Sequence, residues 1–163
     1  MAGKMTASNS DRITVRRYEM SDATAVKSLI QGILSREFPD DQSAYPASDL
    51  ERINIAYGGS RDAFLLAEVS GKLVGTCAVK DEGKGAALLR RLFVHPDHRK
   101  EGIGSRLLSA AIAHCQTLSF KQIKIRTSDR MVDALSLCFA KGFKEDERFQ
   151  LGSVELICMT LRI

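Results

Sequence analysis

A short basic segment with two glycines, Arg99-Lys100-Glu101-Gly102-Ile103-Gly104-Ser105, joins a predicted strand to a predicted helix. Residues 86–94 before it are mostly apolar and predict a strand, which His95-Pro96 ends. After it, apolar residues recur at helical spacing, at Ile103, Leu107, Leu108, Ala111, Ile112 and Cys115. A helix N-terminus offers unpaired N–H groups and a positive partial charge, and glycines let an anion approach them. The segment therefore predicts a phosphate-binding loop.

Three kinds of phosphate-binding loop have to be distinguished here. A dinucleotide fingerprint requires a third glycine three residues after Gly104, where this chain has Leu107. A nucleoside-triphosphate loop requires Gly-Lys-Ser/Thr after four intervening residues, and no glycine of the chain provides it. The remaining pattern is Arg-x-x-Gly-x-Gly. It resembles the acyl-CoA pyrophosphate loop of the GNAT acetyltransferase superfamily.

Other segments resemble the same superfamily, in its order along the chain. Residues 89–96, with their Val-x-Pro ending, resemble its fourth strand, and residues 134–143, ending in Gly142-Phe143, resemble its fourth helix. Residues 64–69 and 73–76 resemble its second and third strands. Residues 13–26 resemble its first strand and helix, so the resemblance extends from Ile13 to Ile163.

The residue pattern predicts an α/β (α+β) fold, and the resemblance implies the same GNAT fold. Strands are expected at residues 13–18, 64–69, 73–79, 86–94, 122–126 and 154–162. Helices are expected after a cap at Ser21 or Asp22, after a cap at Ser48 or Asp49, and at residues 103–115 and 131–141. Early hairpins and a late strand–helix–strand unit predict a mixed, mostly antiparallel sheet of about six to seven strands with helices on both faces. Residues 1–11 are expected to be a flexible tail, and residues 12–163 a single acetyltransferase domain.

Composition limits the classes of partner. Four cysteines without ligand spacing predict reduced thiols, no metal site and a cytoplasmic protein. No apolar run is long enough to span a membrane. The net charge of +4 comes from basic residues interleaved with acids, and aromatic residues make up 6% of the chain. Nucleic acid is therefore not the expected partner, because a base-stacking surface requires aromatic side chains among the basic ones.

The resemblance implies acetyl-CoA as co-substrate and assigns roles to the residues around the loop. The backbone of Leu92, Phe93 and Val94 would pair with the pantetheine arm, and one of these N–H groups would polarise the thioester oxygen. The segment Gly102–Ser105 would bind the pyrophosphate, with Arg99, Lys100 and Glu101 opening the loop. The implied activity is acetyl transfer to a primary amine of a small molecule. A protein or peptide acetyltransferase and an acyl-CoA-binding regulator without turnover remain alternatives, and a homodimer is left open.

Many relatives carry a tyrosine five residues before the phenylalanine of the Gly-Phe ending, where it is thought to protonate the departing thiolate. This chain has Cys138 there. A cysteine has an unperturbed pKa of about 8.5, so Cys138 is a candidate proton donor. The alternative is that Cys138 is a small apolar residue packed in the helix.

The general base and the acceptor site are less defined by the sequence. Glu68 and Glu155 are candidate bases, with water as the alternative. The resemblance places acceptor choice in residues 36–49 and 144–153. There Phe38 and Tyr45 could form a pocket wall, and the acids Asp40, Asp41, Glu145, Asp146 and Glu147 would suit a cationic amine.

Overall fold

A seven-stranded sheet forms the centre of the computed structural model, which describes residues 12–40 and 46–163. The strand order is β1-β2-β3-β4-β5-β7-β6. β4 and β5 run parallel, and the other neighbouring strands are antiparallel. The strands are β1 Ile13–Arg17, β2 Ala63–Val69, β3 Lys72–Gly83, β4 Ala86–Val94, β5 Gln122–Ser128, β6 Lys144–Leu151 and β7 Val154–Arg162. The expected mixed, mostly antiparallel sheet is confirmed.

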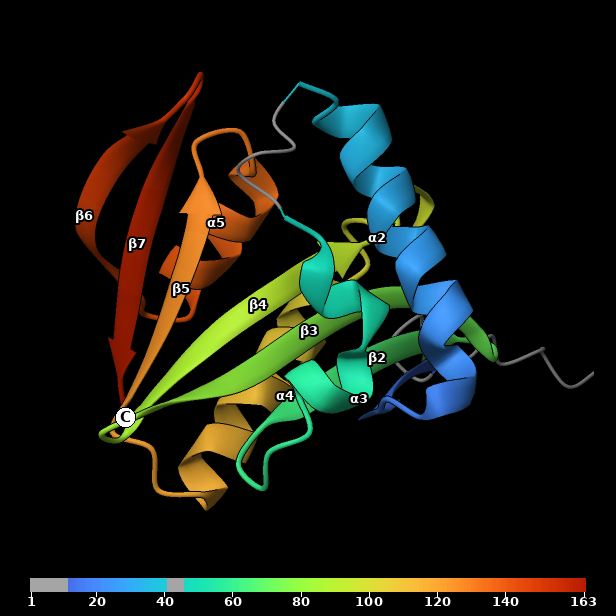
Figure 1. Ribbon diagram of the computed structural model, residues 1–163, viewed down its shortest axis with the longest axis horizontal. Helices are drawn as coiled ribbons and strands as arrows, with labels where there is room; N and C mark the ends of the chain where they lie inside the picture. Colours follow the sequence, from blue (N-terminus) through green and yellow to red (C-terminus); the bar gives the residue numbers. More distant parts are fainter. Residues whose placement is uncertain (1–11, 41–45) are drawn as a thin grey trace, which may run out of the picture.

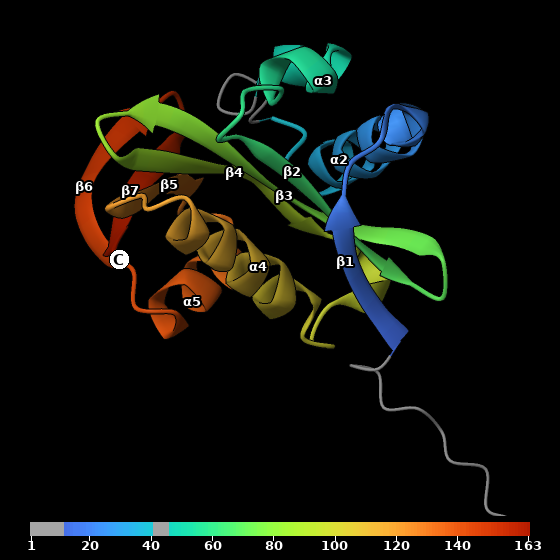
Figure 2. The same cartoon turned by 90° about the horizontal axis from the view of Figure 1, so that it is seen from below.

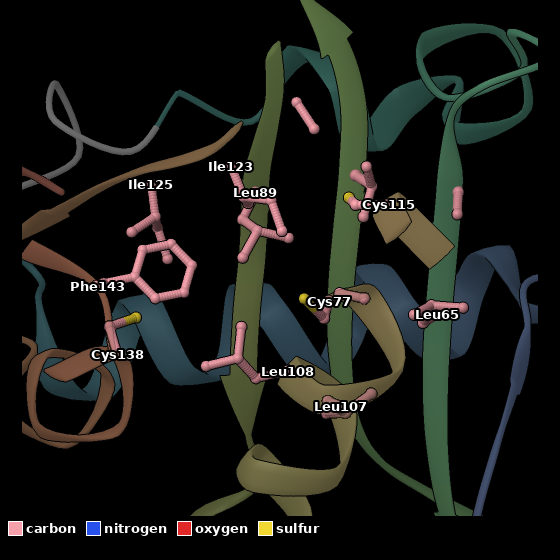
Figure 3. Packing of buried hydrophobic residues seen from close by; sticks show 14 of the residues in the cluster. Leu65, Cys77, Leu89, Leu107, Leu108, Cys115, Ile123, Ile125, Cys138 and Phe143 are labelled. Carbon is pink, nitrogen blue, oxygen red and sulfur yellow. The ribbon is translucent and has the colours of Figure 1, made fainter. Parts of the chain in front are cut away.

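Helices cover both faces of the sheet, as the sequence predicts (Figures 1 and 2). On one face lie α4 (Ile103–Thr117) and α5 (Val132–Ala140). The other face carries α2 (Ala23–Glu37), the short helix α3 (Ile53–Ala56) and the 3-10 turn η3 (Ser48–Glu51). Each face buries its own apolar cluster. Figure 3 shows the α4 side of this core, where Leu107 and Leu108 pack against β3 and β4.

β4 and β5 separate part-way along their length. Their pairing ends at Leu89 and Ile125, although β5 continues to pair with β7 as far as Ser128. β4 also contains a bulge beyond this point, because its register with β3 shifts between Thr76 and Ala78. Arg91 lies at this bulge with a φ of 56°, a left-handed conformation that side chains rarely adopt. The second half of β4 therefore has its β5-facing edge open.

A buried ion pair fixes the bulge to the segment between α2 and β2. The Arg91 and Asp49 side chains form a salt bridge, and they are 6% and 8% exposed. Tyr57 Oη donates to Asp49 (2.6 Å), and Arg91 donates to the Pro46 carbonyl (2.5 Å). Burial alone would raise the pKa of Asp49, but the hydrogen bonds from Arg91 and Tyr57 outweigh it and lower that pKa. The expected cap at Ser48 or Asp49 is wrong, because both residues lie inside η3, whose N-cap is Ala47 without a side-chain hydrogen bond.

The segment before the last strand differs from the expectation. Residues 144–151, expected to be a connecting segment, form the edge strand β6, whose side chains are all exposed. The expected flexible tail, residues 1–11, lies outside the described residues. Among the described helices, none combines the length and apolar character needed to cross a membrane.

Candidate active site

A cavity of about 500 Å³ lies at the open end of β4, between the end of α2 and the beginnings of α4 and α5. Most of the residues predicted to bind a cofactor line it together: Leu92, Phe93, Val94, Arg99, Lys100, Gly102, Ile103, Gly104 and Ser105. The remaining one, Glu101, does not line it and lies 3.3 Å from His98 Nδ1. Sequence analysis did not single out the contributions of α2 and α5, including Ile33, Glu37, Arg130, Met131 and Asp133.

The N-terminus of α4 faces this cavity with unpaired donors. The first hydrogen bond of the helix runs from the Arg106 N–H to the Gly102 carbonyl (3.1 Å). The N–H groups of Ile103 to Ser105 precede that bond and have no acceptor within the helix. Gly102 has a φ of 85°, and a Cβ built there would meet no atom within 4 Å. The glycine therefore leaves free space directly in front of the helix N-terminus, which suits an anion.

The charge of Arg99 is already compensated within the protein. Its guanidinium forms two hydrogen bonds with the Glu37 carboxylate, at 2.5 and 2.6 Å, and its Nε donates to the Val94 carbonyl (3.2 Å). Glu37 raises the pKa of Arg99, so the guanidinium stays charged. Arg99 thus connects the end of α2 to the end of β4, and the backbone and Lys100 remain to receive an anion.

The open edge of β4 offers a second set of donors. His95 N–H donates to the Val74 carbonyl in β3 (2.7 Å). Because successive N–H groups of a strand point to opposite sides, those of Val94 and Leu92 point away from β3. They face the space that β5 has left. An extended amide-containing ligand could pair with this edge as an added strand.

Thr127 provides a further unpaired group near the opening. The residue is 4% exposed, and its buried hydroxyl has no hydrogen-bond partner among the described residues. It lies on β5, two residues beyond the last residue paired with β4, on the same face as Ile125. A buried hydroxyl without a partner is energetically costly. Thr127 does not line the cavity itself.

Cys138 lies in the core and does not line the cavity. It is 0% exposed and lies beside Phe143 and Ile125 (Figure 3). Burial raises the pKa of its thiol to about 12. A general acid works best with a pKa near the operating pH, so this environment opposes the predicted proton-donor role. The surroundings match the alternative, an apolar packing residue.

Neither candidate base reaches the cavity. Glu68 forms an ion pair with Arg16 (2.5 Å) between β2 and the edge strand β1, and Glu155 pairs with Arg148 (2.8 Å) between β7 and β6. The carboxylates that do line the cavity are Glu37, held by Arg99, and Asp133 at the start of α5. Phe38 lines the cavity as predicted, whereas Tyr45 lies outside the described residues. No cluster of metal-ligating side chains occurs in residues 12–40 and 46–163.

Comparison with known proteins agrees with this geometry. A family model described as an acetyltransferase (GNAT) domain matches residues 60–145, more than half of the chain. The chain belongs to the GNAT acetyltransferase family. It is similar to N-acetyltransferase family 8 member 3 of Rattus norvegicus, with 31% identity over 69% of this chain and 54% of the relative. It is also similar to the uncharacterized N-acetyltransferase YhfO of Bacillus subtilis, with 28% identity over 84% of this chain and 93% of the relative.

Solved GNAT structures share the fold. An acetyltransferase of the family from Staphylococcus aureus Mu50 superposes with a TM-score of 0.78 and 26% identity, covering 92% of this chain and 98% of its own. The structure of yncA from Salmonella typhimurium, solved with acetyl-CoA, gives a TM-score of 0.73 at 17% identity, covering 93% of this chain and 94% of its own. The chain spans about half the length of two curated relatives that it matches, N-acetyltransferase family 8 member 3 and the probable N-acetyltransferase camello of Xenopus tropicalis.

Proposed function

We propose that this protein is an N-acetyltransferase that moves an acetyl group from acetyl-CoA to the primary amine of a small molecule. The supporting observation is that the free N–H groups of the α4 N-terminus and of the open β4 edge line one cavity. Residues 12–163 act as one catalytic domain in this proposal. The four cysteines of the chain are free thiols, and the cytoplasm, which keeps thiols reduced, is the proposed location.

The residues present fit the parts of acetyl-CoA, which supplies an activated acetyl thioester when bound. The N–H groups of Ile103, Gly104 and Ser105 bind the diphosphate, with support from the helix dipole and Lys100. The N–H groups of Leu92 and Val94 bind the pantetheine amides and polarise the thioester oxygen. Backbone donors perform both tasks, so the side chains at these positions are free to be apolar.

The chain accelerates the reaction mainly by positioning. Holding an amine and a thioester in one cavity turns an encounter of two molecules into a nearly unimolecular step. The unprotonated amine is the nucleophile that attacks the thioester. Its proton passes to water, since the carboxylates of Glu68 and Glu155 are held in ion pairs away from the cavity. Water also protonates the leaving thiolate, because Cys138 is buried with a raised pKa.

Replacing Gly104 with Val should weaken acetyl-CoA binding by at least about tenfold, or roughly 1.4 kcal/mol. A Cβ at this position would already lie 3.0 Å from Leu137 Cδ2 and 3.6 Å from Val94 Cγ2. The additional methyl groups of valine must therefore enter the cavity beside the free N–H groups. Titration calorimetry with acetyl-CoA measures the effect.

The matched control for this variant is Gly32→Val. Gly32 also lies in a helix, and a Cβ there would meet no atom within 4 Å. This variant should bind acetyl-CoA like the wild type. Equal affinities for Gly104→Val and Gly32→Val, with both proteins folded, would remove the α4 N-terminus from the cofactor site.

Cys138→Ala should leave turnover within about threefold of wild type, far from the 10²-fold loss typical of a missing general acid. The reason is that the thiol is buried, has a raised pKa and does not line the cavity. Steady-state thiol release at saturating acetyl-CoA measures this. A fall of 10²-fold or more with unchanged cofactor affinity would instead show that Cys138 is the acid.

The proposed function competes with an acyl-CoA-binding regulator, because the tyrosine position is occupied by Cys138 and β4 offers no carboxylate. A thiol-release assay with acetyl-CoA and a panel of primary amines distinguishes the two. The enzyme should release free CoA in proportion to the amine. A protein that binds acetyl-CoA and releases no thiol with any amine or peptide would be the regulator.

A further inference from the structure

One half of the sheet has a face that no described helix covers. α4 and α5 pack beneath the sheet, and α2 and α3 lie over β2 to β4, which leaves β5, β7 and β6 open on the upper side of Figure 2. Ile123 and Ile125 of β5 point into the α4 core. Because strand side chains alternate, Lys124 and Arg126 point to the uncovered face, where both are exposed.

Two arginines flank the place where β4 and β5 separate. Leu89 and Ile125 are the last paired residues, and Arg90 and Arg126 follow them directly on the two strands. Leu89 belongs to the α4 core, so Arg90 lies on the same face of the sheet as Arg126, beside Asp49 of η3. The cofactor donors of α4 lie on the opposite face. Neither guanidinium lines the cavity itself; both lie beside the point where the two strands separate. An amine that approaches this point from the α2 side of the sheet would meet them first.

None of the three cations has a carboxylate that it does not share, among the residues that the structure describes. Lys124 and Arg126 form no ion pair within residues 12–40 and 46–163. The carboxylate nearest to Arg90 is Asp49, at 3.9 Å, and Asp49 is already bound to Arg91 and Tyr57. Lys124 and Arg126 are therefore exposed cations without an ion pair, and Arg90 shares Asp49 with Arg91, so this side of the sheet could attract an anion.

Two of the five acids that suggested a cationic acceptor, Glu145 and Asp146, are engaged by neighbours, whereas Asp40 is exposed and Asp41 lies outside the described residues. Glu145 and Glu155 both bind Arg148. Asp146 accepts a hydrogen bond from the Thr160 hydroxyl. Glu147 lies opposite Cys158, which lies opposite Arg126, so two strand spacings separate it from that arginine. None of these acids forms an ion pair with Lys124 or Arg126 among the described residues.

We propose that the acceptor amine also carries an anionic group, a carboxylate or a phosphate, which Arg126 and Arg90 bind while the amine reaches the thioester. This inference rests on the proposed function. Arginine is suited to the task because its planar guanidinium forms paired hydrogen bonds with carboxylate and phosphate oxygens. The same positive surface disfavours diamines and other cationic acceptors.

The test compares acceptors that share one skeleton. Wild-type kcat/KM is measured for an amino carboxylate, the matching aminophosphonate, the neutral amide and a diamine, each corrected for its fraction of neutral amine. We expect the better of the two anionic amines to exceed the amide by about tenfold or more, the size of a lost charged hydrogen bond. The ratio of carboxylate to phosphonate identifies which anion the site prefers.

Variants locate the effect on the sheet. Arg126→Gln should raise KM for the preferred anionic amine by about tenfold while kcat and the values for the amide change little. Lys72→Gln is the matched control, since Lys72 is an exposed cation at the start of β3, six residues along the strand from Ala78, the partner of Arg90. It removes the same charge and should leave the preference intact. A preference for the amide or the diamine, or an anion preference that survives Arg126→Gln, would overturn the proposal.

A binding measurement separates this inference from the proposed function. Calorimetry in the presence of CoA compares the N-acetylated amino carboxylate and aminophosphonate with the N-acetylated amide, and needs no turnover. The anion site is supported if the anionic product binds more tightly than the amide and Arg126→Gln removes this difference. If no amine releases thiol at the same time, the anion site stands and the proposed acetyltransferase activity is contradicted. Thiol release with equal affinity for all the products would support the enzyme and contradict the anion site.

Discussion

Replacing Asp49 with Ala should destabilise the protein by about 3–5 kcal/mol, the cost of leaving a buried charge without its partner. Arg91 is 6% exposed and would keep only the Pro46 carbonyl as an acceptor among the contacts described above. Tyr57 would lose its acceptor in the same step. For a chain of this length the melting temperature should fall by roughly 6–20 °C. Thermal or urea unfolding at neutral pH measures the change.

Glu51→Ala is the matched control, because Glu51 belongs to the same 3-10 turn and pairs with Lys27 in solvent. That exposed pair should contribute about 1 kcal/mol or less. The double variant Asp49→Ala/Arg91→Leu should recover part of the loss, since it removes both charges together. Equal effects of Asp49→Ala and Glu51→Ala would show that the buried pair does not hold the bulge.

The effect of Asp49→Ala also has a pH dependence of known sign. The folded-state pKa of Asp49 is lowered, so its contribution is complete above the unfolded value of about 3.9 and is lost as the pH falls through the folded value. The difference in unfolding free energy between wild type and variant should therefore be constant at neutral pH and shrink below about pH 4.

Acetyl-CoA at a hundred times its dissociation constant should stabilise the folded protein by roughly 2.7 kcal/mol, because it binds the folded state alone. This corresponds to a rise in melting temperature of roughly 5–10 °C for a chain of this size. NAD and ATP at the same concentration should raise it much less, because the loop lacks their glycine and lysine patterns. Differential scanning fluorimetry with the three ligands measures the shifts. An NAD shift as large as that of acetyl-CoA would restore the dinucleotide alternative.

The parts of the fold that could be predicted are those in which local pattern and burial agree. The strand before the loop and the helix from Ile103 are examples, because their apolar residues face one core with the spacing of their element. The edge strand β6 was missed, since its sequence KEDERFQL has no apolar alternation and every side chain is exposed. Its strand conformation comes from pairing with β7. That long-range contact leaves no local signal.

The candidate site also has a part that could be predicted from the sequence and a part that could not. The cofactor segment was accessible to sequence analysis because its glycines act through the backbone next to one helix end. Arg91 and Asp49 were not, because they are 42 residues apart and a charged side chain is ordinarily expected in solvent. Likewise the positions of Thr127, Arg90 and Arg126 can be interpreted only once the place where β4 and β5 separate is known.

Transfer of a labelled acetyl group is the most direct test of the account. The protein is incubated with acetyl-CoA carrying an isotopic label in the acetyl group and with the amine panel, and the products are analysed by mass spectrometry. The account predicts that the label appears on the nitrogen of an amine, that the yield follows the amount of protein, and that Gly104→Val lowers the yield at limiting acetyl-CoA. Tight binding of labelled acetyl-CoA without label on any amine or peptide would contradict it.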